Sequence, residues 1–232
     1  YHSKAILILK RSTKYFPIIE KYLKEYNIPN DFKYLAITES GLENVTSPAG
    51  AKGFWQFMPK TGKAYGLEIN DHVDERYNLE KSTKAACEYL NKLYKKFNSW
   101  TLAAAAYNMG ENGLKKQMDK QKASNYYDLK LNNETSRYIF RIVAYKLIDQ
   151  NPKIYGFDLN KQDYYQPLKT YNIEVTKTID NIAEYAVTLN LNYKIIKYLN
   201  PWILKNKIEF KEKKYILKLP LNGSLKIKYF LK

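Results

Sequence analysis

Residues 31–41 read DFKYLAITESG, and this stretch determines the fold. Phe32, Leu35 and Ala36 recur at the spacing of one apolar helix face, which predicts a helix. Gly41 then ends it, because glycine accepts the left-handed conformation that is common just past a helix end. Glu39 therefore lies in the last turn. From the residues alone, this carboxyl is either a partly buried group with a raised pKa or an ordinary charged helix end.

Helical patterns continue on both sides of this stretch, from Thr13 to about Gln150. Between Gly41 and Leu79 the sequence changes to a long loop rich in Gly, Pro, Ser and Asn, with a short helical piece opening at Pro59. Long ordered loops in a helical body usually carry function. Further helices are predicted at Leu79–Phe97, Trp100–Asn108 and Glu134–Asp149.

The composition is that of a folded, soluble protein, with 45% hydrophobic and 27% charged residues. No apolar run reaches the roughly 18 residues of a membrane span, and residues 1–14 lack the features of a signal peptide. The single cysteine, Cys87, excludes an internal disulfide and is expected to be a buried thiol. The net charge of +16 suits nucleic acid, anionic lipid or an anionic cell wall, although scattered lysines favour a solvated basic surface.

Four motifs follow one another in this order and carry a resemblance to a known family. They are Glu39-Ser40, residues 47–59 (SPAGAKGFWQFMP), residues 106–110 (AYNMG) and residues 134–138 (ETSRY). Together they resemble the soluble-lytic-transglycosylase superfamily, and within it the membrane-bound lytic transglycosylase D family. The resemblance covers about Phe16 to Asp149.

The resemblance implies a lysozyme-like helical domain in which Glu39 is the only catalytic carboxylate. In that family the acid protonates the bond between N-acetylmuramic acid and N-acetylglucosamine. It then takes the proton from the muramic acid 6-hydroxyl, which closes on C1 to leave a 1,6-anhydro end. No water is consumed and no cofactor or metal is implied. Other positions carried over from the family motifs are expected around Glu39 or along the glycan cleft: Ser47, Gln56, Met58, Tyr107, Asn108, Glu134 and Tyr138.

Each of these positions also has a structural interpretation, since Ser47 suits a turn, Asn108 a helix end, and Met58 or Tyr138 a core. The chain also departs from the common family pattern. Residues 53–56 read GFWQ where the superfamily usually has Gly-Leu-Met-Gln, and Met109 replaces a small residue. Phe54 and Trp55 could stack on sugar rings, although two adjacent aromatic residues cannot both face one cleft.

Beyond residue 151 the pattern changes to strand, helix, helix, strand, at Tyr171–Val175, Ile179–Leu189, Tyr193–Leu199 and Lys214–Leu219. This order resembles a LysM domain, a βααβ unit that binds N-acetylglucosamine-containing glycans. We therefore expect a mainly α protein with a lysozyme-like domain at 1–155, a linker at 156–168 and a small α+β module at 169–232. Because Lys177-Thr178 stands where glycan-binding copies have small residues, the module either binds glycan or is a degenerate copy that packs against the catalytic domain.

Other functions are less compatible with the sequence. A goose-type lysozyme would need Glu43 or Asp71 as a second carboxylate, and a decayed, non-catalytic peptidoglycan-binding protein would not need the intact motifs. Residues 71–75 (DHVDE) offer a weak cation site, but two histidines cannot assemble the usual zinc sites. No serine-hydrolase elbow or nucleic-acid-binding motif occurs.

The expected partner is therefore the glycan strand of peptidoglycan, and nucleic acid is not expected. The expected location is the periplasm or the outer-membrane-associated cell envelope of a bacterium. The resemblance is compatible with membrane attachment through a removed N-terminal lipid anchor. The oligomeric state does not follow from the sequence.

Overall fold

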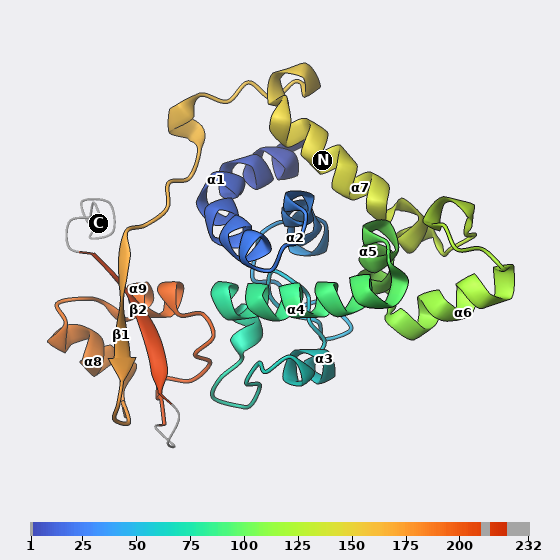
Figure 1. The fold of residues 1–232 in the computed structure, drawn as a ribbon. Helices are drawn as coiled ribbons and strands as arrows, with labels where there is room; N and C mark the ends of the chain where they lie inside the picture. Colours follow the sequence, from blue (N-terminus) through green and yellow to red (C-terminus); the bar gives the residue numbers. More distant parts are fainter. Residues whose placement is uncertain (1, 210–213, 222–232) are drawn as a thin grey trace.

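The computed structural model describes residues 2–209 and 214–221 (Figure 1). A helical body comes first, and the C-terminal module, residues 170–220, follows. Residues 210–213 and 222–232 of the predicted module lie outside the described part. The helices of the body are α1 (His2–Glu25), α2 (Lys33–Ser40), α3 (Pro59–Ala64), α4 (Leu79–Phe97), α5 (Trp100–Met109), α6 (Glu111–Gln121) and α7 (Asn133–Gln150). The module contains β1 (Thr170–Val175), α8 (Ile182–Thr188), α9 (Tyr193–Leu199) and β2 (Tyr215–Pro220).

Local sequence signals set most helix ends. The side chain of Ser99 accepts a hydrogen bond from the Leu102 amide at the start of α5, the usual contact of a helix N-cap. Gly41 ends α2 with a φ of 66°, which confirms its predicted role. The prediction was wrong at the start of the chain, where α1 begins at His2 rather than near Thr13, because Ile8 and Leu9 extend its buried face.

The short helix α2 lies at the centre of the body, between α1 and α7 (Figure 1). Leu35 and Ala36 are fully buried in its core. The small residues 103–106, all alanine, let α5 approach its neighbours closely, and they too are buried. α2 is thus surrounded by packed helices, and this packing fixes the position of its last turn.

The C-terminal module is a two-stranded antiparallel sheet with two short helices. β1 pairs with β2 in the register Thr170↔Pro220 to Val175↔Tyr215. Asn200, buried after α9, donates to the Lys218 carbonyl at 2.8 Å and accepts from the Lys218 amide at 2.8 Å. Ile179 was predicted to open the first helix, but it pairs with Ile208 instead, and α8 begins only at Ile182.

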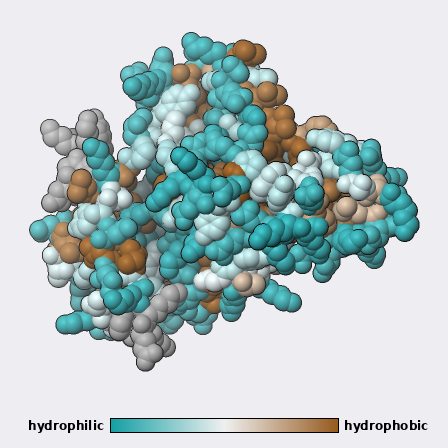
Figure 2. Space-filling model, in the orientation of Figure 1, coloured by the Kyte–Doolittle hydropathy of each residue, from teal (hydrophilic) through white to brown (hydrophobic). Residues whose placement is uncertain are grey.

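The module packs directly on the body. Val73, from the loop before α4, is 3% exposed and belongs to the module's own hydrophobic core. The segment between the two parts follows α1, where the Tyr165 amide donates to the Lys10 carbonyl at 3.0 Å. Figure 2 shows a largely hydrophilic surface, with apolar side chains gathered over α7 and over the module. None of the described helices combines the length and apolar character needed to cross a membrane.

Candidate active site

The carboxyl of Glu39 projects from the last turn of α2 and is partly buried. The hydroxyl of Tyr138, on α7, donates a hydrogen bond to its Oε1. Burial raises the pKa of Glu39 from 4.5 to about 7. The Tyr138 hydrogen bond and the charge of Arg141 act in the opposite direction, whereas the charge of Glu134 raises the pKa further. Near neutral pH this group can therefore both give and take a proton.

Tyr138 is 1% exposed. Burial raises its pKa well above the ordinary value, and the neighbouring Glu39 carboxylate adds to this effect. The phenol therefore stays protonated and remains a donor when Glu39 is ionised. Tyr138 was predicted at the site, whereas Arg141, which lies one helical turn further along the same face of α7 and also acts on the Glu39 pKa, was not. Helical spacing from Tyr138 was the signal that could have found it.

Tyr107, near the end of α5, was expected around Glu39 or along the glycan cleft. Its hydroxyl donates to the Trp55 carbonyl at 2.8 Å. The tyrosine still lies close to the acid, since the Glu39 charge, together with burial, raises the Tyr107 pKa well above its usual value. Tyr107 therefore ties the surroundings of Glu39 to the backbone of the loop that carries Gln56.

That loop, residues 45–58, is called the cleft loop below. Gln56 has a φ of 49° and its Nε2 donates to the carbonyls of Val45 and Gly53, at 3.1 and 2.8 Å. Ser47 accepts from the Ala51 amide at 3.0 Å. Both side chains thus fold the loop on itself, and no hydrogen bond joins Ser47 to Glu39. Met58, 43% exposed, is left at the surface before α3.

Asn108 and Glu134 join the end of α5 to the start of α7. The Asn108 amide donates to the Glu134 carboxylate at 2.9 Å and accepts from the Thr135 hydroxyl at 2.8 Å. These bonds hold a negative charge near Glu39, which is why Glu134 raises its pKa. Both residues therefore belong to the same neighbourhood as Glu39.

Phe54 and Trp55 are both buried, and only Phe54 borders a cavity, the one described below between α1, α4 and the C-terminal module. They are 3% and 0% exposed, and the Trp55 indole donates to Thr83 at 2.9 Å. Phe54 packs edge-on against Tyr15, with 4.8 Å between ring centroids. The suggestion that they stack on sugar rings is wrong, because the turn at residues 53–56 packs Phe54 against α1 and Trp55 against α4.

Two of the carboxylates considered for other chemistries, Glu43 and Asp74, form ion pairs. Glu43 forms an ion pair with Arg11 of α1. Asp74 is held by Arg76 and Lys52, which keep its pKa below the ordinary value even though burial alone would raise it. Among the residues that the structure describes, no group of three or more His, Cys, Asp or Glu side chains could hold a metal. Burial raises the pKa of Cys87 to about 12, so it is no thiolate nucleophile near neutral pH.

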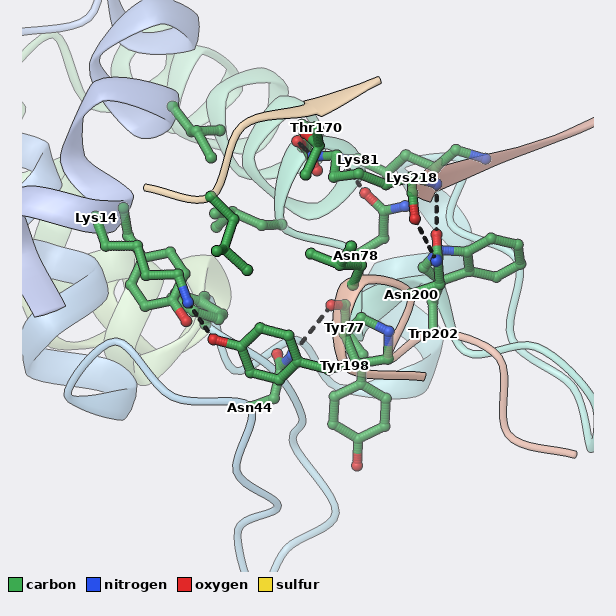
Figure 3. A pocket seen from close by; sticks show the side chains of 18 of the residues that line it. Lys14, Asn44, Tyr77, Asn78, Lys81, Thr170, Tyr198, Asn200, Trp202 and Lys218 are labelled. Carbon is green, nitrogen blue, oxygen red and sulfur yellow. Dashed lines mark hydrogen bonds and ion pairs between the residues drawn. The ribbon is translucent and has the colours of Figure 1, made fainter. Parts of the chain in front are cut away.

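A cavity of about 930 Å³ lies elsewhere, between α1, the start of α4 and the C-terminal module (Figure 3). Glu43 lines it, whereas Glu39 does not. Lys14 reaches across it from α1 to donate to the Tyr198 hydroxyl, and Asn44 donates to the Tyr77 carbonyl at 3.2 Å (Figure 3). It is therefore a space between the two parts of the molecule, separate from the surroundings of Glu39.

The sequence matches two domain families. Residues 16–130 match the transglycosylase SLT domain, and residues 165–223 match the soluble lytic transglycosylase C-terminal LysM-like domain. Membrane-bound lytic murein transglycosylase D of Escherichia coli K12 is 32% identical over 182 residues, covering 76% of this chain. The protein of the same name from Escherichia coli O6:H1 gives the same figures. The chain spans 40% of the length of these relatives.

The fold is similar to that of the 70-kDa soluble lytic transglycosylase of Escherichia coli. The TM-score is 0.50 at 21% identity, over 68% of this chain and 28% of that protein. At this identity the likeness concerns the fold alone. It confirms the predicted class, a mainly helical body followed by a small α+β module.

Proposed function

Because this chain belongs to the lytic transglycosylases that carry an SLT domain and a LysM-like module, we propose that it cleaves the glycan strands of bacterial peptidoglycan without consuming water. The bond cleaved is the β-1,4 link from N-acetylmuramic acid to N-acetylglucosamine, and the product end is a 1,6-anhydromuramic acid. The observation that carries this proposal is the environment of Glu39, a sheltered carboxyl with a pKa of about 7 and a permanent donor in Tyr138.

The proposed reaction uses Glu39 twice. The protonated acid first gives its proton to the glycosidic oxygen while the bond from C1 to that oxygen breaks, with the substrate's N-acetyl group assisting. The carboxylate then takes the proton of the 6-hydroxyl as O6 bonds to C1. Glu39 ends protonated, as it began, so protons balance over the cycle. A pKa near 7 suits both steps, because neither protonation state is strongly favoured near neutral pH.

Hydrolysis with water, the goose-type alternative, needs a base that activates the water. The residues considered for that role do not support it. Glu43 is paired with Arg11 and lines the separate cavity, while Asp71 lies exposed at the tip of the loop before α4. The internal 6-hydroxyl nucleophile removes the need for a second carboxylate.

Within this function, Gln56, Met58 and Asn108 are proposed to line the glycan cleft, with Ser47 and Tyr107 shaping it. Glu134 and Tyr138 close it from α7. The partner is peptidoglycan, and the proposed location is the periplasm or the outer-membrane-associated envelope, by similarity to the membrane-bound lytic murein transglycosylase D of Escherichia coli. We also propose membrane attachment through a removed N-terminal lipid anchor.

Digestion of purified peptidoglycan tests the reaction. We expect anhydro-ended fragments, which are lighter by one water than the reducing-end fragments of a lysozyme. Glu39→Gln keeps the shape of the side chain but removes the transferable proton, so the rate should fall by about three orders of magnitude or more. Glu43→Gln, a matched change on the far side of Gly41, should leave the rate within about twofold. Reducing ends alone would contradict the transglycosylase proposal, and an active Glu39→Gln would contradict the assignment of the acid.

A further inference from the structure

We propose that the C-terminal module is a positioning element for the cleft loop and acts on it through two residues of the helical body, Val73 and Arg76. This inference rests on the proposed function only in that the cleft loop is taken to bind glycan. The module would then affect glycan binding in the cleft even for substrates too short to reach the module. Its contribution is distinct from any binding of cell wall by the module itself.

The first link joins the module to the hairpin formed by residues 68–75. Within the hairpin, the Asn70 amide donates to the Val73 carbonyl at 2.8 Å. The module then adds a third strand-like segment. The Asp74 amide donates to the Trp202 carbonyl at 2.9 Å, and the Leu204 amide donates to the His72 carbonyl at 2.8 Å. These two bonds flank the antiparallel bridge between Val73 and Ile203.

Side chains reinforce this pairing. Val73 and Ile203 are 3% and 1% exposed, and both belong to the module's core, so the hairpin supplies part of that core. The Tyr215 hydroxyl of β2 donates to Glu68 at 2.9 Å. Lys218 borders the cavity between the two parts (Figure 3). Its ammonium group pairs with Glu80 at the start of α4. The module is therefore docked by backbone, apolar and charged contacts together.

The second link joins the hairpin to the cleft loop. Arg76 is 3% exposed, and Asp74 holds its guanidinium with bonds of 2.8 Å to Nε and 2.7 Å to Nη2. The remaining nitrogen, Nη1, donates to the Gly50 carbonyl at 3.0 Å and the Phe57 carbonyl at 3.1 Å. One guanidinium thus clamps two points of the cleft loop that lie on either side of Gln56. Asp74 orients the Arg76 guanidinium, and the backbone amide of Asp74 donates a hydrogen bond to the module.

The chain of contacts runs from Trp202 and Ile203, through residues 73–76, to the backbone of the cleft loop. Residues 73–76 are all buried. The hairpin therefore cannot shift without disturbing either the module or the cleft loop. Glu39, in contrast, is held by α2 and α7. The module should therefore influence how the cleft binds glycan and leave the ionisation of the acid unchanged.

The test is Val73→Asp in the full chain, which places a carboxylate in the shared core. Val187→Asp is the matched control, because Val187 lies on α8 and is 71% exposed. In Val73→Asp we expect backbone amides of the cleft loop to exchange hydrogen for deuterium about tenfold faster, whereas exchange in α2 and α7 stays as in the parent. On a short soluble peptidoglycan oligosaccharide, kcat/KM should fall about tenfold, mainly through KM.

In Val73→Asp the pH at which activity declines should stay near 7. The conservative variant Val73→Ile should keep the hydrogen exchange and the kinetics of the parent. A general loss of structure would not leave the pH profile in place. If the module undocks, seen as faster exchange in residues 196–204, while the cleft loop and KM are unchanged, the proposal is overturned.

Should Val73→Asp fail to fold, the Lys218 to Glu80 pair gives a milder test. Lys218→Glu and Glu80→Lys should each loosen the cleft loop and raise KM about twofold, and the double exchange should restore both. Absence of any effect in both single variants would also overturn the proposal. The exchange measurements need no substrate. Unchanged exchange in the cleft loop would therefore contradict the role of the module without bearing on the proposed reaction, which Glu39→Gln tests.

Discussion

At the scale of single residues, Glu39 shows how opposing effects set one pKa. Burial raises the pKa most, and the charge of Glu134 adds to it. The hydrogen bond from Tyr138 and the charge of Arg141 lower it, so the value settles at about 7 rather than higher. Activity that needs the protonated acid is therefore expected below pH 7 and should decline as the pH rises through 7.

Tyr138→Phe should move that decline to higher pH. The hydrogen bond from Tyr138 favours the charged form of Glu39, so its removal raises the pKa of Glu39. A hydrogen bond to a charged group is worth roughly 1.5 kcal/mol, which corresponds to about one pKa unit. The maximal rate should fall about tenfold, because the phenol also stabilises the carboxylate formed in the first step. A pH–rate profile measures both effects.

Tyr126→Phe is the control for this prediction. Tyr126 is also a buried tyrosine, and its hydroxyl donates to the carbonyls of Thr135 and Ser136 in the first turn of α7. Its loss should lower stability by about 1 kcal/mol without moving the pH at which activity declines. A Tyr138→Phe profile that coincides with this control, or shifts to lower pH, contradicts the assigned role of Tyr138.

Residue identities were largely accessible from the sequence, whereas residue contacts were not. The family motifs located Glu39, Tyr138 and Tyr107. They did not reveal that the Tyr107 hydroxyl bonds to the Trp55 backbone, because a motif records a side chain and not the carbonyl it meets. The role of Arg76 as a clamp on the cleft loop depends on three segments meeting in space, and no local pattern encodes that.

At the scale of elements, the cleft loop depends on glycine where the backbone approaches another segment. Gly53 has a φ of 80°, and a Cβ built there would lie 2.0 Å from the Arg76 carbonyl oxygen. Gly50 has nearly the same conformation, with a φ of 86°, but no heavy atom lies within 4 Å of its Cβ position. Comparing the two glycines therefore distinguishes the energetic cost of the left-handed backbone conformation from the cost of steric overlap with Arg76.

Gly50→Ala should cost about 1 kcal/mol, the usual penalty of a left-handed non-glycine residue. Gly53→Ala should cost about 3 kcal/mol or more, because the overlap with Arg76 must also be relieved. Urea denaturation of both variants measures the difference, and glycan cleavage should weaken only in Gly53→Ala. Equal losses of stability in the two variants would show that the close approach to Arg76 has no energetic consequence.

The periodicity of apolar residues predicted the helix well where it packs by one face, as in α4. It was less reliable where a segment pairs or packs with residues far away in the sequence. Ile179 looked like a helix opening because apolar residues follow it, yet its backbone pairs with Ile208. The start of α1 was missed for a similar reason, since Ile8 is buried against the distant Gly41 region.

At the scale of the whole molecule, the two parts share a hydrophobic core through Val73, and further bonds join Tyr215 to Glu68 and Lys218 to Glu80. A module that only followed the body on a flexible segment would unfold independently. Here the loss of either part exposes apolar surface on the other. The free energies of unfolding of the two parts are therefore coupled.

Differential scanning calorimetry should accordingly show one transition for the full chain, with the calorimetric and van't Hoff enthalpies close to equal. Val73→Asp should separate it into two transitions, while the exposed control Val187→Asp should leave one. Two resolved peaks in the parent protein would mean that the docking contacts are too weak to couple the parts.

The bridge between Val73 and Ile203 also bears on how such a protein can change over evolutionary time. A recombination event that exchanged only the sequence after the connecting segment would bring a new module against a hairpin shaped for the old one. The segment that could be transferred intact begins before residue 68, inside the helical body. Substitutions at Val73 and Ile203 are accordingly expected to occur in compensating pairs.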